Sequence, residues 1–86
     1  MNTIKIRSEY QDLDKYEFYN KDIVYYKKDT NIFHNPYGPA VISKNGYIVY
    51  IVDNKWHRLD GPARILPNGE EQYWINNKLL NKEQFE

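Results

Sequence analysis

The chain has 86 residues, a length that suits one small domain. Basic and acidic residues number 12 each, so no net charge draws the chain to nucleic acid or to an anionic membrane. Cysteine is absent, which excludes disulfides and thiolate chemistry. The opening residues MNTIKIRSEY contain no apolar run of the length of a signal peptide or membrane span, so we expect a cytoplasmic protein without a membrane partner.

Residues 1–31 predict an N-terminal strand followed by a degenerate hairpin. The segment TIKIR (3–7) alternates apolar and polar side chains, as a half-buried strand does. The segment KYEFYNKDIVYYK (15–27) has two runs rich in aromatic and β-branched residues around the polar turn NKD. The linker from this hairpin to His34 is two residues longer than the corresponding linker later in the chain.

Residues 32–54 and 55–78 are two copies of one unit, displaced by 23 positions. The matched positions are His34 and His57, Gly38 and Gly61, Pro39 and Pro62, Asn45 and Asn68, Gly46 and Gly69, and Tyr50 and Tyr73. A fixed period of this length is typical of repeat proteins, in which a neighbouring unit covers the apolar face that one unit cannot bury. Because these residues recur, we interpret them as structural.

Each copy predicts a β-hairpin that turns at an Asn-Gly pair. The sequences KNG (44–46) and PNG (67–69) each lie between short runs of Val, Ile, Tyr or Trp. An Asn-Gly pair in this setting is a strong hairpin signal, because glycine readily adopts the positive φ of the turn. We therefore predict hairpins over residues 39–52 and 62–75.

Alternation along these strands predicts two sheet faces of different character. One face is apolar in both copies, and we expect it to be the core: Ala40, Ile42, Ile48, Tyr50, Val52, Ala63, Ile65, Tyr73 and Ile75. The opposite face is less regular, and its apolar members are the candidate partner-binding residues: Tyr26, Val41, Tyr47, Val49, Ile51 and Trp74. Contiguous apolar patches rimmed by charge usually mark protein-binding sites. A curled sheet, or termini folded across it, would instead bury this patch.

Residues 79–86 predict a C-terminal cap of one helical turn. Asn81 lies three residues before Gln84, the spacing of a capping box. No segment has a long helical periodicity. We therefore expect residues 1–86 to form a single all-β domain, an antiparallel meander of three stacked hairpins in one sheet with a short helical turn at its end.

Several segments resemble the MORN repeat: DNKWH (53–57), PNG (67–69) and NNK (76–78). The segment HRLDGPA (57–63) looks like a variant of that repeat in uncharacterised phage, bacterial and giant-virus proteins. The variant has one residue more than the usual spacing between His and Gly, and Pro follows the Gly. The resemblance covers residues 15–80 and implies an elongated meander that serves as a scaffold, dimerisation surface or binding platform, without chemistry of its own. It also implies a phage accessory protein or an inhibitor of a host protein.

The sequence predicts no catalytic residue, no metal site and no cofactor. Equivalent residues of successive hairpins are displaced by two strand spacings, about 9–10 Å, whereas two ligands of one zinc ion lie within about 4 Å. We therefore expect His34 and His57 to bond to backbone in the bend that leads to Gly-Pro-Ala. No Ser-His-Asp arrangement and no recurring carboxylate pair is present, so we expect the protein not to be an enzyme.

The function predicted first is a non-enzymatic module that binds another protein, or a second copy of itself as a homodimer, through a sheet face or a sheet edge. One alternative is a binder of a small ligand or of single-stranded nucleic acid, because YYKK (25–28) interleaves aromatic rings with cations. Zero net charge does not favour nucleic acid. The other alternative is a structural homodimer or scaffold subunit.

Overall fold

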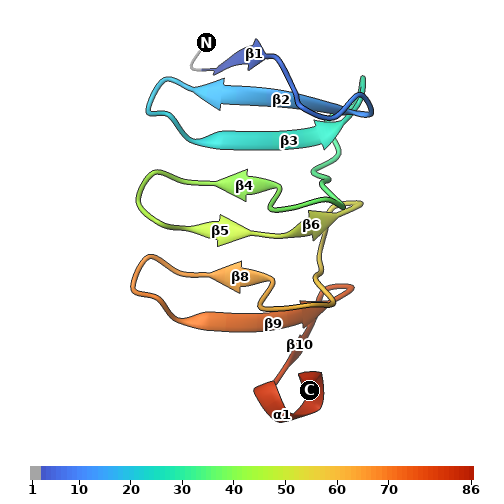
Figure 1. The fold of residues 1–86 in the computed structure, drawn as a ribbon, viewed down its shortest axis with the longest axis vertical. Helices are drawn as coiled ribbons and strands as arrows, with labels where there is room; N and C mark the ends of the chain where they lie inside the picture. The colour runs from blue at the N-terminus through green and yellow to red at the C-terminus, as the bar shows by residue number, and fades with distance from the viewer. Residues whose placement is uncertain (1–2) are drawn as a thin grey trace.

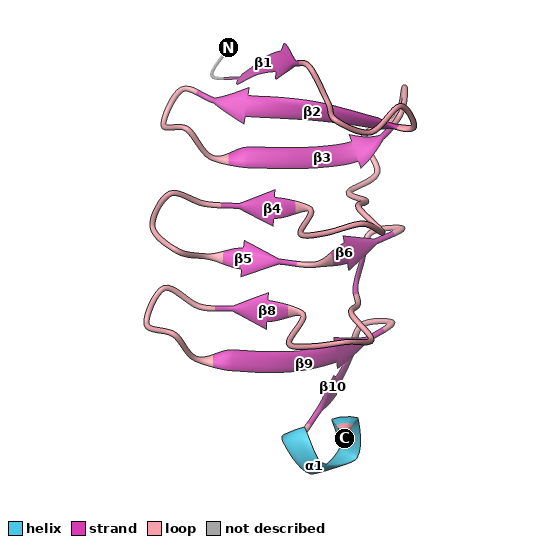
Figure 2. Cartoon of the chain, in the orientation of Figure 1, coloured by secondary structure: helices cyan, strands magenta, loops and turns pink. Residues whose placement is uncertain are grey.

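A computed structural model describes residues 3–86, and it consists of antiparallel strands stacked along the long axis of the molecule (Figure 1). Eight of the strands form one sheet, in the order β1 (Thr3–Ile6), β2 (Leu13–Phe18), β3 (Ile23–Lys27), β4 (Val41–Ile42), β5 (Ile48–Val49), β8 (Arg64–Ile65), β9 (Glu71–Ile75) and β10 (Lys78–Leu80). Strands β6 (Ile51–Val52) and β7 (Lys55–Trp56) pair with each other. The short helix α1 (Lys82–Phe85) follows β10 (Figure 2). The predicted all-β antiparallel fold is confirmed.

The repeat of the sequence is also a repeat of hydrogen bonds. The amide of Tyr25 donates to the carbonyl of Ala40 at 2.8 Å, and the amide of Tyr50 donates to that of Ala63 at 2.7 Å. With Tyr73 opposite Ala63, these five residues form one row across the sheet, in which tyrosine and alanine alternate. Both alanines are fully buried because a tyrosine lies on each side of them.

The hairpin turns on one side of the sheet share a three-residue loop. Ser43 donates to Tyr47 and Gly46 donates to Ser43, with Gly46 at a φ of 99°. This is a type I turn followed by a left-handed residue, and Gly69 takes the same place in the next hairpin with a φ of 91°. In the first hairpin Lys21 stands at that position with a φ of 78°, so the degenerate copy keeps the turn without the glycine.

A second kind of turn, which the sequence analysis did not identify, closes each repeat on the other side of the sheet. Residues Asp53 and Asn54, and likewise Asn76 and Asn77, all have positive φ, the conformation of a two-residue type I′ turn. The side-chain oxygen of Asn54 accepts the amide of Phe33 at 2.8 Å. Each turn reverses the chain, so that β7 pairs with β6 and β10 pairs with β9.

The sheet has two faces, which we name by their cross-strand rows. The valine face carries Val24, Val41 and Val49, which are neighbours on β3, β4 and β5. The tyrosine face carries the row Tyr25, Ala40, Tyr50, Ala63 and Tyr73, together with the neighbouring isoleucines Ile23, Ile42, Ile48 and Ile65. The predicted core face is the tyrosine face, and both Tyr50 and Tyr73 are half-buried there.

The prediction that Val49 and Ile51 contact a partner is wrong. Their side chains are 2% and 7% exposed, and they form the deepest cluster of the molecule with Ala40. The reason is that β6 leaves the sheet after Tyr50 and pairs with β7, which lays Trp56 over the valine face.

The core is small because the main sheet has no second layer. Seven apolar residues of the described chain are buried: Leu13, Val24, Tyr25, Ala40, Val49, Ile51 and Ala63. The accessible surface is 5833 Å², against about 5,400 Å² expected for a compact monomer of this mass. At the C-terminal end Phe85 packs on Tyr73 with ring centroids 4.7 Å apart, and the predicted capping box of Asn81 and Gln84 is confirmed. Residues 3–86 include no helix with the length and apolar character needed to cross a membrane.

Candidate functional site

Five side chains on the valine face form a packed group that we call the tryptophan cluster: Tyr47, Trp56, Arg64, Gln72 and Trp74. The guanidinium of Arg64 lies over the ring of Trp56, 4.7 Å from its centroid, and its Nε donates to the hydroxyl of Tyr47 at 3.0 Å. The Oε1 atom of Gln72 accepts both Nη1 of Arg64 and Nε1 of Trp74, each at 3.1 Å. The cluster therefore holds its polar groups by bonds among its own members.

All five members of the tryptophan cluster are half-buried, so each has both a fixed position and an accessible part. Below them lie the buried aliphatic side chains of Val49 and Ile51. Tryptophan, tyrosine and arginine are the residue types that most often dominate the binding energy of protein interfaces. Side chains that are ordered before binding lose less entropy when a partner arrives.

A second group, the N-terminal aromatic cluster, lies on the valine face over β2 and β3. Tyr26 meets Tyr16 edge to face at 5.5 Å and packs against Phe33 at 5.0 Å between centroids. A hollow of about 230 Å³ beside it is lined by Thr3, Tyr16, Phe18, Tyr26, Thr30 and Asn31. This hollow is too small for a drug-sized ligand, whose sites usually measure about 300–1,000 Å³.

The predicted partner-binding residues thus fall into three places. Tyr47 and Trp74 belong to the tryptophan cluster, Tyr26 belongs to the N-terminal aromatic cluster, and Val41 is half-buried against the core. Trp56, Arg64 and Gln72 were missed. The sequence does align Trp56 with Phe33, but alternation along a strand does not reveal that β7 pairs with β6 and brings Trp56 beside Ile51.

The two histidines make equivalent bonds in the two repeats. Nδ1 of His34 accepts the amide of Asp53 at 3.0 Å, and Nδ1 of His57 accepts the amide of Asn76 at 3.1 Å. The expectation that each histidine bonds to backbone is confirmed, but the bond is to the two-residue turn and not to the Gly-Pro-Ala bend. An accepting Nδ1 places the proton of a neutral imidazole on Nε2, so the 3.8 Å approach of His34 to the Asp53 carboxylate is not an ion pair in this state.

The repeated asparagines Asn45 and Asn68 build the hairpin turns. The side-chain oxygen of Asn45 accepts the amide of Tyr47 at 3.1 Å, and that of Asn68 accepts the amide of Glu70 at 2.9 Å. These bonds fix the start of the three-residue loops. Over residues 3–86, no group of three or more His, Asp or Glu side chains has the arrangement of a metal site.

Comparisons of the chain with protein-family models, with curated proteins and with solved structures give no match.

Proposed function

We propose that this protein is a non-enzymatic module that binds another protein through the tryptophan cluster. The observation that carries the proposal is a set of tryptophan, tyrosine and arginine side chains that are fixed by mutual contacts and half-buried on the valine face. Such a surface binds by shape and apolar contact, with little ordering of its own side chains.

A protein partner suits this surface better than nucleic acid does. Arg64 is the only cation of the tryptophan cluster, and its Nε and Nη1 already bond to Tyr47 and Gln72. Single-stranded nucleic acid is usually held by a charged groove that follows the backbone in addition to stacking rings. The chain as a whole has no net charge to supply such a groove.

The resemblance to the phage and bacterial variants of the MORN repeat gives the setting that we propose, an accessory protein or inhibitor that occupies a site on a host protein. Within that setting the rigid sheet presents the cluster, and occlusion of the partner's surface is the mechanism. No step of this mechanism uses bond making or breaking.

The test is capture of a partner by purified protein and by matched variants. Trp74→Gln and Tyr47→Ser remove cluster members, whereas Tyr19→Ser removes an aromatic ring that is 78% exposed at the first hairpin turn and is not a member of the cluster. We expect wild type and Tyr19→Ser to capture the same protein from a host lysate, and the two cluster variants to lose it while their circular dichroism stays unchanged. Folded cluster variants that still capture the protein would contradict the proposal, as would a wild type that sediments as a self-associated species in which the cluster is covered.

A further inference from the structure

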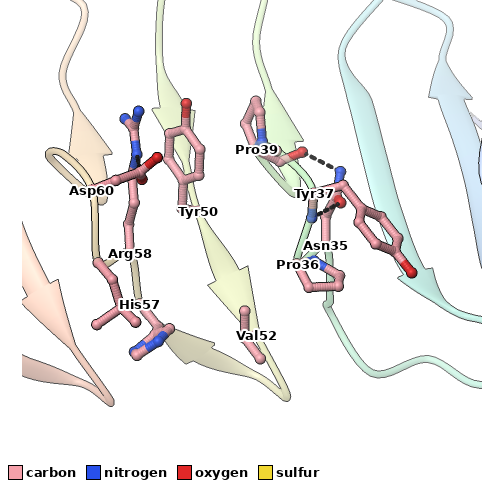
Figure 3. A pocket seen from close by; sticks show the side chains of 11 residues that line it. Asn35, Pro36, Tyr37, Pro39, Tyr50, Val52, His57, Arg58 and Asp60 are labelled. Carbon is pink, nitrogen blue, oxygen red and sulfur yellow. Dashed lines mark hydrogen bonds and ion pairs between the residues drawn. The ribbon is translucent and has the colours of Figure 1, made fainter.

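A groove of about 630 Å³ lies on the tyrosine face, between the two loops that lead into Gly-Pro-Ala (Figure 3). Its walls are residues 35–39 of the first repeat and residues 57–60 of the second, and Tyr50 and Val52 lie between them. The ring of Tyr37 turns away from the groove, where it stacks on Tyr10 at 4.7 Å. The groove is on the face opposite to the tryptophan cluster.

The two loops use different side chains to hydrogen-bond the same backbone carbonyl, that of the proline in Gly-Pro-Ala. Asn35 and Arg58 are equivalent in the repeat, and each donates to the carbonyl of the proline four residues later. Nδ2 of Asn35 reaches the oxygen of Pro39 at 2.9 Å, and Nη1 of Arg58 reaches that of Pro62 at 3.0 Å. The fold therefore needs a donor at this position, and an asparagine supplies it in the first copy.

Arg58 makes two contacts besides its bond to Pro62. Its guanidinium lies on the ring of Tyr50, 4.0 Å from the centroid, and its Nε donates to Asp60 at 2.9 Å. On its other side, a Cβ at Gly61 would come within 2.7 Å of Cζ, whereas a Cβ at Gly38 would stay 3.9 Å from Asn35. The second copy therefore needs glycine at position 61, because a Cβ there would clash with the guanidinium of Arg58 that packs on Tyr50.

The side chain of Arg58 lines the groove and keeps one nitrogen, Nη2, available for a ligand. Nε and Nη1 have the partners just described, and Nη2 bonds to no residue in the range 3–86. Beside it Leu59 is 70% exposed, in the place that Pro36 takes in the first copy. Neither the charge of Arg58 nor the exposure of Leu59 is required by the repeat, since the first copy folds with Asn and Pro there.

We propose that the groove binds an extended acidic protein segment, with a carboxylate that accepts from Nη2 of Arg58 and a neighbouring apolar side chain against Leu59 and Val52. Nη2 of Arg58 can donate a charge-assisted hydrogen bond to a carboxylate, and a guanidinium that is already ordered by Asp60, Pro62 and Tyr50 loses little entropy on pairing. Asp60, 86% exposed beside Arg58, repels a dianion more strongly than a single carboxylate, so a phosphate is the less favoured anion. This site acts independently of the proposed function on the valine face.

The test is an NMR titration with three probes: the peptide acetyl-Leu-Glu-Leu-amide, its Gln counterpart and inorganic phosphate. The probes are added at millimolar concentrations, the range expected for one ion pair and a few apolar contacts. We expect saturable shifts of the Arg58 Nε–H signal and of the Leu59 and Val52 amides with the Glu peptide, and about tenfold weaker binding of the Gln peptide. Equal binding of the two peptides, tighter binding of phosphate, or no saturable shift would overturn the proposal.

The repeat supplies its own control, because Arg58→Asn installs the residue of the first copy. This variant keeps a donor for Pro62, so we expect it to stay folded and to lose the Glu peptide, read from the Leu59 and Val52 amides. Asp60→Asn removes the competing carboxylate, and we expect it to tighten binding. If Arg58→Asn melts early, Arg58→Lys provides the same test, because lysine keeps the charge without the planar guanidinium that bonds to Asp60, Pro62 and the carboxylate at once. A folded Arg58 variant that binds as wild type does would overturn the proposal.

Discussion

The indole rings of Trp56 and Trp74 meet edge to face, with centroids 4.7 Å apart and planes at 88°. They come from β7 and β9, so their contact ties the small β6–β7 ladder to the main sheet. Trp56 also packs on the cluster formed by Ala40, Val49 and Ile51. Trp56 therefore both covers the core cluster and belongs to the tryptophan cluster.

We predict that Trp56→Ala is the more costly of the two tryptophan substitutions. It removes a large ring from the core cluster and should lower the free energy of unfolding by about 3 kcal/mol, whereas Trp74→Ala should lower it by about 1–2 kcal/mol because Trp74 contacts the core only through its neighbours. Urea denaturation followed by circular dichroism measures both. The double variant should reveal a coupling of about 1 kcal/mol for the aromatic pair. Strictly additive losses would show that the ring contact adds nothing beyond burial.

The fold was predictable from the sequence because the repeat and its turns are local signals. The offset between His34 and His57 indicates the length of the repeat, and Gly46 and Gly69 indicate where the hairpin of each repeat turns. Alternation then assigned side chains to faces correctly, but it did not indicate which face would be covered. Val49 and Ile51 were misassigned because their cover, Trp56, arrives through a change of strand partner after Tyr50, which no local pattern encodes.

Lys21→Gly should stabilise the protein. Lys21 has a φ of 78° at the place that Gly46 and Gly69 occupy in the later hairpins. Glycine relieves the strain of a side chain in the left-handed region, which costs roughly 1–2 kcal/mol in the folded state. The greater conformational freedom of glycine in the unfolded chain offsets about 0.4–1 kcal/mol of this stabilisation. We expect a net gain of about 0.5–1 kcal/mol in chemical denaturation. Lys21→Ala is the control and should give no gain, because alanine keeps the Cβ; equal gains for both would point to the loss of the lysine charge.

The histidine bonds to the two-residue turns predict a difference between two substitutions at His57. Asn places its side-chain oxygen on Cγ, where Nδ1 of histidine is bonded, so His57→Asn should keep an acceptor for the amide of Asn76. His57→Gln places its oxygen one atom farther out and should lose the bond, at a cost of about 1 kcal/mol. Thermal melts of both variants compare them directly, and the same order is expected at His34. A Gln variant as stable as the Asn variant would show that the ring acts by packing alone.

Asp14 predicts a loss of stability in acid. Its side chain is 6% exposed, and the hydrogen bond from the amide of Asp29 at 2.8 Å, together with Lys5, lowers the pKa of this carboxyl below its usual value. A carboxyl with a lowered pKa in the folded state stabilises that state above its unfolded pKa of about 3.9 and loses this contribution as the pH falls through the folded value. Asp14→Asn should therefore be less stable near neutral pH, by about 1 kcal/mol, and its unfolding free energy should depend less on pH below 4. Parallel pH profiles of the two proteins would contradict this assignment.

The groove on the tyrosine face was beyond prediction for a different reason. Asn35 and Arg58 differ in size and charge, so an alignment of the two copies does not mark them as equivalent, although both donate to a proline carbonyl in the structure. Gly38 and Gly61 are also equivalent in the repeat, so the sequence predicts the same structural role for both. The structure separates them, because neither has positive φ and only Gly61 lies against a guanidinium.

This difference predicts unequal effects of alanine at the two glycines. Gly38→Ala meets its nearest neighbour at an ordinary 3.9 Å and should be nearly neutral, whereas Gly61→Ala would place its Cβ 2.7 Å from Cζ of Arg58. The arginine is flexible enough to move away, so the expected loss is that of its contact with Tyr50 and its bond to Pro62, about 1–2 kcal/mol together. In an Arg58→Asn background Gly61→Ala should become nearly neutral as well, since the first copy already combines Asn with an open glycine. Chemical denaturation of wild type, Gly61→Ala, Arg58→Asn and the double variant measures this double-mutant cycle. If Gly61→Ala still destabilises the protein when Arg58 is absent, the backbone itself requires glycine at this position.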